Sequence, residues 1–330
     1  VKEHMLEVED HQSIWQEALN TAVRKGEPAD FSNHRDNQVY AQFKLLSRTR
    51  YLHHLILDHD NEIAQKIRRK LILSPSCNID CNNKSTPVIQ VCSIGGGPGY
   101  DHLAICLVSW YLYQIQLTRQ RQEILSKDGE FEEKDKGLTD WLPKPIFTKI
   151  FDLYHEEWKD IMEQLQLCFQ QETNTMTPAD STNCDWDWWK TNQMTMHFGD
   201  LRCGSSRGKN ENNDNGHDDN NNSREMKSCI CSADIIVFSF VLHENSSFLL
   251  AEDEGEQKLS GILQFMLESA KTGAIIICMD SGNSLWPVFR EIAVQYGWSF
   301  MSDAQKNHKI ILGPKSFCLM ERVRLCNPQQ

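Results

Sequence analysis

The stretch VIQVCSIGGGPGYDHLA, residues 88–104, joins an apolar run to four glycines and a proline. Five of its first seven residues are apolar, and most of these are β-branched, which is typical of a strand in the middle of a parallel sheet. After the glycines, apolar residues recur at helical spacing at Leu103, Ala104, Leu107 and Val108. The glycines therefore lie at a strand-to-helix turn, where left-handed backbone and close approach of a ligand are both available.

The spacing of the glycines separates two classes of ligand. The dinucleotide fingerprint G-x-G-x-x-G requires a third glycine at the position of Tyr100. Gly95, Gly97 and Gly99 instead satisfy the spacing G-x-G-x-G. A tight turn that binds no ligand is the alternative that the glycines alone leave open.

Length and composition indicate a globular protein. The chain has 330 residues, of which 40% are hydrophobic and 24% are charged, and this suits one α/β domain with insertions. No run approaches the roughly 20 apolar residues of a membrane-spanning helix, and no signal peptide pattern is present. The sequence begins at Val1 rather than at methionine, so we expect further N-terminal residues in the natural protein.

The twelve cysteines do not indicate disulfides in this chain. Cys92, Cys106 and Cys278 fall within predicted strands or helices, where cysteine acts as a small hydrophobic residue. We therefore expect an intracellular location, cytoplasmic or nuclear. Pairs such as Cys77 and Cys81 lack the C-x₂-C spacing of a zinc ribbon, so no metal site is predicted.

The net charge of −12 argues against a protein that binds nucleic acid over its whole surface, because phosphate contacts need a positive field. Basic residues do gather between Arg48 and Lys70. This region leaves a local contact with RNA open, although a solvated helix face is the simpler interpretation.

The pattern of hydrophobicity divides the chain into two parts. We predict an N-terminal helical segment with a linker at 1–87 and one α/β domain at 88–330. Insertions interrupt this domain at about 123–145 and 204–228. The second insertion is dominated by Asn, Asp and Gly, so we expect it to be disordered.

Beyond the glycine turn, predicted strands and helices alternate to the end of the domain. Asp152 falls near the carboxyl end of one predicted strand, and another predicted strand ends at Asp200. The predicted strands cover 147–153, 194–200, 235–240 and 273–281; the predicted helices cover 101–122, 158–167, 259–270 and 288–296; and 308–313 with 316–325 form an antiparallel hairpin at the sheet edge.

This order of elements, with the G-x-G-x-G turn, resembles the class I S-adenosylmethionine-dependent methyltransferases over residues 88–325. The resemblance implies a Rossmann-like, doubly wound and mostly parallel sheet with a reversed strand near its end. It implies S-adenosylmethionine as the cofactor and methyl transfer as the reaction.

The resemblance also implies a role for each matching residue. The glycines Gly95, Gly97 and Gly99 would meet the methionine part and the ribose, and Asp152 would accept hydrogen bonds from the ribose hydroxyls. Asp200, with the amide of Leu201, would meet the adenine. Ser239 and Phe240 would line the transfer site, and His243 would be the base that removes a proton from the acceptor.

Two departures from the family pattern bear on function. The family has an acid two residues before the first glycine, where this chain has Ser93, and Asp101 is the candidate substitute. The strand at 235–240 is not followed by an Asn/Asp-Pro-Pro-aromatic motif, which favours a small molecule or a protein as methyl acceptor, with RNA still open. The alternatives are a non-catalytic sensor or scaffold that binds the cofactor, and an NAD-dependent oxidoreductase.

Overall fold

The structure is a computed structural model of the whole chain. It describes residues 34–57, 62–72, 87–126, 143–176, 192–201, 217–239, 241–242, 245–246, 250–253, 256–259, 261–280, 286–300 and 316–323, together with Glu17, Asn20, Thr21, Arg24 and Lys25.

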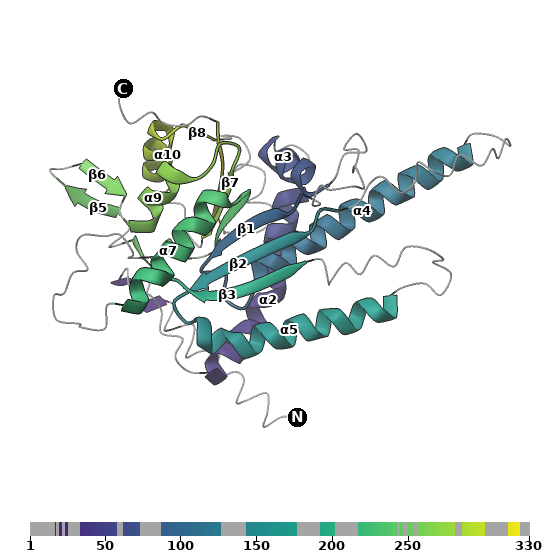
Figure 1. Ribbon diagram of the computed structural model, residues 1–330, viewed down its shortest axis with the longest axis horizontal. Coiled ribbons are helices and arrows are strands. Elements are labelled where there is room, and N and C mark those ends of the chain that lie inside the picture. Colours follow the sequence, from purple (N-terminus) through teal and green to yellow (C-terminus); the bar gives the residue numbers. More distant parts are fainter. Residues whose placement is uncertain are drawn as a thin grey trace.

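A seven-stranded sheet forms the centre of the molecule, with strand order β3-β2-β1-β4-β7-β9-β8 (Figure 1). The pairs from β3 to β7 are parallel, whereas β9 runs antiparallel to β7 and to β8. This confirms a mixed α/β fold with a mostly parallel sheet. The strands are β1 (Ile89–Ile94), β2 (Ile146–Asp152), β3 (Gln193–Phe198), β4 (Ile235–Ser239), β7 (Ile275–Asp280), β8 (Trp298–Phe300) and β9 (Ser316–Arg322).

The reversed strand differs in part from the predicted hairpin. The second predicted arm is present as β9, but its neighbours are β7 and the three-residue strand β8. The other predicted arm, 308–313, lies outside the described residues. A strand as short as β8 carries too little alternation to be recognised from sequence.

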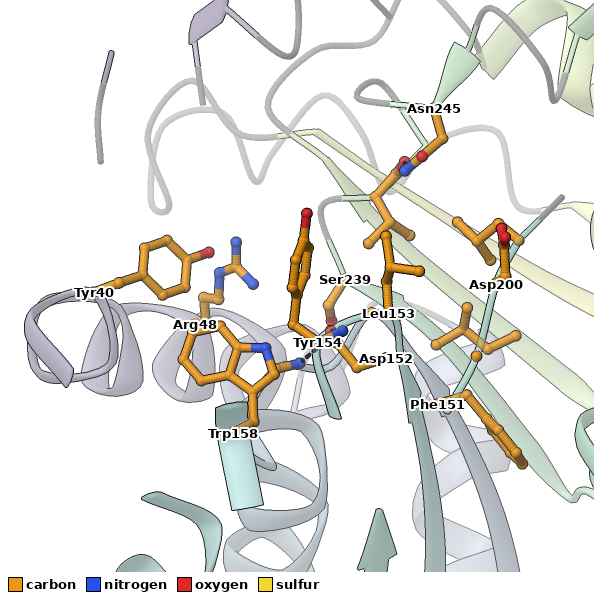
Figure 2. A pocket seen from close by; sticks show the side chains of 16 residues that line it. Tyr40, Arg48, Phe151, Asp152, Leu153, Tyr154, Trp158, Asp200, Ser239 and Asn245 are labelled. Atoms are coloured by element: carbon orange, nitrogen blue, oxygen red, sulfur yellow. Dashed lines mark hydrogen bonds between the residues drawn. The ribbon is translucent and has the colours of Figure 1, made fainter. Parts of the chain in front are cut away.

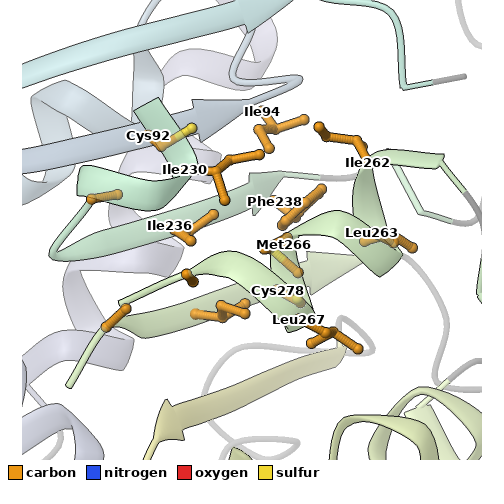
Figure 3. Packing of buried hydrophobic residues seen from close by; sticks show 14 of the residues in the cluster. Cys92, Ile94, Ile230, Ile236, Phe238, Ile262, Leu263, Met266, Leu267 and Cys278 are labelled. Carbon is orange, nitrogen blue, oxygen red and sulfur yellow. The ribbon is translucent and has the colours of Figure 1, made fainter. Parts of the chain in front are cut away.

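Helices cover both faces of the sheet, because its central strands are apolar on both sides. Ile235 and Val237 of β4 face one helical layer, whereas Ile236 and Phe238 face the other. Figure 3 shows the second layer, in which α7 and α9 pack on β1, β4 and β7. The first layer contains α2 (His34–Leu57), α3 (Glu62–Leu71) and α4 (Tyr100–Ser126); the second contains α7 (His217–Ser232), α9 (Gly261–Ser269) and α10 (Trp286–Gln295).

The N-terminal segment is helical where the structure describes it, as predicted, and it packs directly on the α/β domain. Helix α2 packs against α4 and against α5 (His155–Met176). On α3, Lys66 forms an ion pair with Glu321 of β9. The residues between Arg48 and Lys70 are therefore not one solvated face: Arg48 is buried and Lys66 is paired with an acid.

The prediction that the second insertion is disordered is wrong in part. Residues 217–232 form helix α7, although 204–228 were expected to be disordered; residues 204–216 lie outside the described residues. Met226, Cys229 and Ile230 lie at helical spacing and are buried against the sheet. These few apolar residues anchor the C-terminal half of the helix on the sheet. The Asn-rich sequence before them has no helical pattern of apolar residues, so the helix was not predicted.

Smaller differences concern element boundaries. Helix α4 continues to Ser126, into the first predicted insertion, of which 127–142 lie outside the described residues. Two short strands, β5 (Leu250–Asp253) and β6 (Glu256–Leu259), form a separate antiparallel pair that was not predicted. No helix within the described ranges is long and apolar enough to cross a membrane.

Candidate functional site

A cleft lies where β1, β2, β3 and β4 end, with α2 and the start of α5 on one side (Figure 2). Open α/β sheets bind ligands at the carboxyl ends of their strands. The cleft is lined by Tyr40, Arg48, Ile94, Gly95, Gly97, Phe151, Asp152, Leu153, Tyr154, Trp158, Gly199, Asp200, Leu201, Ser239, Val241 and Asn245.

The glycine turn after β1 presents bare backbone to this cleft. Gly95, Gly97 and Gly99 all have positive φ, at 67°, 53° and 100°. A Cβ added at Gly95 would lie 1.9 Å from Cγ1 of Val241, so only glycine fits there. Gly95 and Gly97 line the cleft, whereas the space beside Gly99 is filled by Met194.

Another glycine, Gly199, follows β3 and allows the end of β3 to approach the end of β2 closely. A Cβ at this position would lie 2.6 Å from Cβ of Phe151. The Gly199 amide donates a 3.1 Å hydrogen bond to the carbonyl oxygen of Asp152, and the Gly95 amide donates one of 2.9 Å to that of Phe151. The ends of β1, β2 and β3 are thereby held together around Asp152.

Asp152 is the last residue of β2, and its carboxylate faces the glycine turn. Its Oδ2 accepts a hydrogen bond from the amide of Gly97 at 3.3 Å, and its Oδ1 accepts one from the amide of Tyr154 at 3.0 Å. The indole N–H of Trp158 also donates to this carboxylate.

The electrostatic surroundings of Asp152 act in two directions. Burial raises the pKa of its carboxyl above the usual value, while the three N–H donors and the charge of Arg48 oppose the rise. These donors leave the carboxylate with further acceptor capacity, since two carboxylate oxygens offer about four sites. Asp152 therefore both caps the turn after β2 and lines the cleft as an acceptor.

Behind the glycine turn, Asp101 links two strands to the first turn of α4. Its Oδ2 accepts a hydrogen bond from Ser93 Oγ at 2.7 Å, and its Oδ1 accepts one from Ser239 Oγ at 2.6 Å. All three residues are buried. Burial raises the pKa of the Asp101 carboxyl, and the two hydroxyl donors counteract this. An acid is thus present beside Ser93, although it comes from α4.

The opposite side of the cleft is aromatic. Tyr40 comes from α2 and Trp158 from α5, and their ring centroids lie 5.9 Å apart. Arg48 of α2 lies against the Tyr40 ring, with its guanidinium carbon 5.2 Å from the ring centroid. Sequence analysis did not place these residues at the site, nor Tyr154 and Asn245, because nothing in their local pattern indicates which strand ends they approach.

The remaining predicted site residues fall into two groups. Asp200, Leu201 and Ser239 all line the cleft, so the structure brings them together with the glycine turn and Asp152. Phe240 and His243 lie outside the described residues. Within the described part of the chain, no three His, Cys, Asp or Glu side chains are grouped as metal ligands.

These features fit S-adenosylmethionine chemically. Its ribose hydroxyls need an acceptor, which Asp152 offers; its amino-acid part needs close backbone, which Gly95 and Gly97 allow. The flat adenine needs apolar surface, which Leu201 and Phe151 provide beside Asp200.

Comparison with known proteins gives little independent support. No protein-family model matches the chain, and no curated protein matches it. A provisional class I S-adenosylmethionine-dependent methyltransferase from Listeria monocytogenes is similar at 9% identity and a TM-score of 0.34, over 91% of this chain and 72% of that one.

A second similar structure is human N-acetylserotonin methyltransferase in complex with S-adenosylmethionine. It shares 12% identity with a TM-score of 0.30, over 94% of this chain and 66% of that one. TM-scores below 0.5 do not establish a common fold. The strand order and the cleft of this chain therefore carry the functional proposal.

Proposed function

We propose that this protein is an S-adenosylmethionine-dependent methyltransferase that binds its cofactor at the carboxyl ends of β1, β2 and β3. One observation carries the proposal: the carboxylate of Asp152 lies against a G-x-G-x-G turn whose glycines all have positive φ. This juxtaposition joins a hydroxyl acceptor to exposed backbone in one cleft. The parallel sheet with a reversed strand at β9 agrees with the same family.

The bound cofactor supplies a methyl group on a sulfonium. In the transfer, the carbon–sulfur bond breaks, a bond forms between the methyl carbon and the acceptor, and the sulfur keeps the electron pair of a neutral thioether. The protein must orient the acceptor and take up a proton from it. His243 stays the predicted base, and a small molecule or a protein the favoured acceptor.

Two alternatives are less well supported. The sensor or scaffold hypothesis rested on Ser93, but Asp101 places a carboxylate 2.7 Å from the Ser93 hydroxyl. The NAD-dependent oxidoreductase needs a third glycine where Tyr100 begins α4, and the Tyr100 side chain there is fully buried.

Titration calorimetry with S-adenosylmethionine, S-adenosylhomocysteine and NAD tests the proposal. We expect both sulfur nucleosides to bind and NAD not to bind. A screen with methyl-labelled S-adenosylmethionine against small molecules, peptides and RNA then tests transfer. Binding of NAD alone would overturn the proposal, and cofactor binding without transfer to any acceptor class would favour the sensor.

A further inference from the structure

The cleft contains a guanidinium from a helix that precedes β1, the glycine turn and α4 in the sequence. Arg48 lies on α2, and it is the only basic side chain among the described residues that line the cleft. Its side chain is enclosed, at 8% exposure. A positive charge held at this depth stabilises an anionic group that enters the same cleft.

Two aromatic rings fix the position of this guanidinium. Its central carbon lies 5.2 Å from the ring centroid of Tyr40 and 5.7 Å from that of Tyr100. Figure 2 shows Arg48 among the side chains of Tyr40, Tyr154 and Trp158. Contacts with two ring faces orient a guanidinium before a ligand arrives, which lowers the entropic cost of binding.

The guanidinium lies at the glycine-turn end of the cleft. Tyr100 directly follows Gly99, and the charge of Arg48 also acts on Asp152 at the end of β2. The cleft thus holds a cation beside the glycine turn, which suits a ligand group with negative charge.

We propose that Arg48 binds the carboxylate of the cofactor's amino-acid part, so that α2 forms one wall of the cofactor site. The inference rests on the proposed function, in which the glycine turn holds this part of S-adenosylmethionine. A guanidinium can bind both oxygens of a carboxylate at once.

Calorimetry with two ligands tests the assignment. S-adenosylhomocysteine carries the carboxylate, whereas 5′-methylthioadenosine has the same nucleoside and a thioether but no amino-acid part. We expect Arg48→Met to weaken S-adenosylhomocysteine binding about 10- to 100-fold, as for loss of a charged hydrogen-bonded pair, and to leave 5′-methylthioadenosine within about twofold. Arg48→Lys keeps the charge but not the forked guanidinium, so its affinity for S-adenosylhomocysteine should lie between those of the wild type and Arg48→Met.

Arg50→Met is the matched control, because Arg50 lies on the same helix, is exposed and donates to His54. It should bind both ligands as the wild type does. Decarboxylated S-adenosylhomocysteine gives a measurement on the wild-type protein, which should bind it about 10- to 100-fold more weakly than S-adenosylhomocysteine.

The outcomes separate the two proposals. Equal losses for both ligands in Arg48→Met, or no loss for either, would overturn the role of Arg48 while the cofactor site stands. If the wild-type protein binds neither ligand, the proposed function itself fails. Should Arg48→Met not fold, the decarboxylated ligand decides, and unchanged affinity for it would refute the inference.

Discussion

Ser93 Oγ donates a 2.7 Å hydrogen bond to Asp101 Oδ2, eight residues further along the chain and across the glycine turn. The same carboxylate accepts a second bond from Ser239 at the end of β4. The first turn of α4 therefore places a carboxylate beside Ser93, the position at which the resemblance to methyltransferases implies an acid. The Asp101 carboxylate lies next to Ser93, although Asp101 follows the glycine turn and Ser93 precedes it.

Exchanging the two side chains tests this relationship. Ser93→Asp alone places two carboxylates within hydrogen-bonding distance, so we expect a loss of about 3 kcal/mol in the free energy of unfolding. The double variant Ser93→Asp/Asp101→Ser restores one acid facing one hydroxyl and should recover most of that loss. Urea unfolding of both single variants and the double variant gives the coupling energy, and simple additivity would contradict the exchange.

Replacing Gly95 by alanine should impair folding and binding more than the same change at Gly273. Both glycines have positive φ, at 67° and 79°, so both variants incur backbone strain of about 1–2 kcal/mol. Only at Gly95 does the new Cβ collide, with Val241, whereas nothing lies within 4 Å of it at Gly273. Thermal unfolding and S-adenosylhomocysteine titration compare them. If Val241→Ala does not relieve Gly95→Ala, the collision is not the cause.

Asp152→Ala should weaken the binding of S-adenosylhomocysteine and of 5′-methylthioadenosine alike. Both ligands carry the ribose, and loss of a charged acceptor amounts to about 1.5–3 kcal/mol, or roughly 10- to 100-fold in Kd. The variant also leaves the Tyr154 amide and the Trp158 indole without their acceptor, so circular dichroism must show native structure. Unchanged calorimetric affinity in a folded variant would remove Asp152 from the cofactor site.

The contribution of His102 to stability should decrease as the pH falls from about 6.5 towards 4. Burial lowers the pKa of this side chain from 6.5 to about 4, and its Nδ1 lies 2.8 Å from Oγ1 of Thr148. Between these values the unfolded chain binds a proton that the folded protein does not, so the free energy of unfolding decreases as pH decreases. The slope contributed approaches about 1.4 kcal/mol per pH unit.

Urea unfolding at pH 7, 6 and 5 measures this dependence, with His102→Gln as the comparison. The raised pKa values of Asp101 and Asp152 act in the opposite direction, since the folded protein then holds the extra protons. Both carboxyls are present in wild type and variant, so the difference in slope isolates His102. Identical slopes in the two proteins would show that the pKa of His102 is the same in the folded and the unfolded states.

Deletions in the Asn-rich segment that reach into helix α7 should destabilise the protein, because α7 packs on the sheet. Removing 206–226 takes away Met226, which is fully buried, and Glu225, which pairs with Lys149 of β2 at 2.8 Å. We expect that deletion to destabilise the protein strongly. Met226→Ala alone should lower the free energy of unfolding by about 2–5 kcal/mol, whereas the exposed Ser228→Ala should change it by no more than about 0.5 kcal/mol. Equal midpoints for the two variants would mean that α7 does not pack as described.

Much of the sheet followed from local pattern. Continuous apolar runs predict β1, β4 and β7, because a strand covered on both faces must be apolar throughout. The glycine turn could be predicted from the spacing of its glycines, because glycine adopts positive φ at little cost, as Gly95 and Gly97 do here. Asp152 and Asp200 were also found locally, since each comes at or just after the end of a strand.

The contents of the cleft beyond those strand ends were decided by tertiary structure. Arg48 had the sequence pattern of a basic helix face, yet α2 packs on α4 and α5 and brings this side chain 5.7 Å from the ring of Tyr100. Helix α7 forms because three of its apolar residues pack against the sheet, although the preceding sequence favours disorder. Local pattern determines backbone conformation and burial within a few residues. Which side chains meet across 50 residues depends on how the elements pack, and no short stretch contains that information.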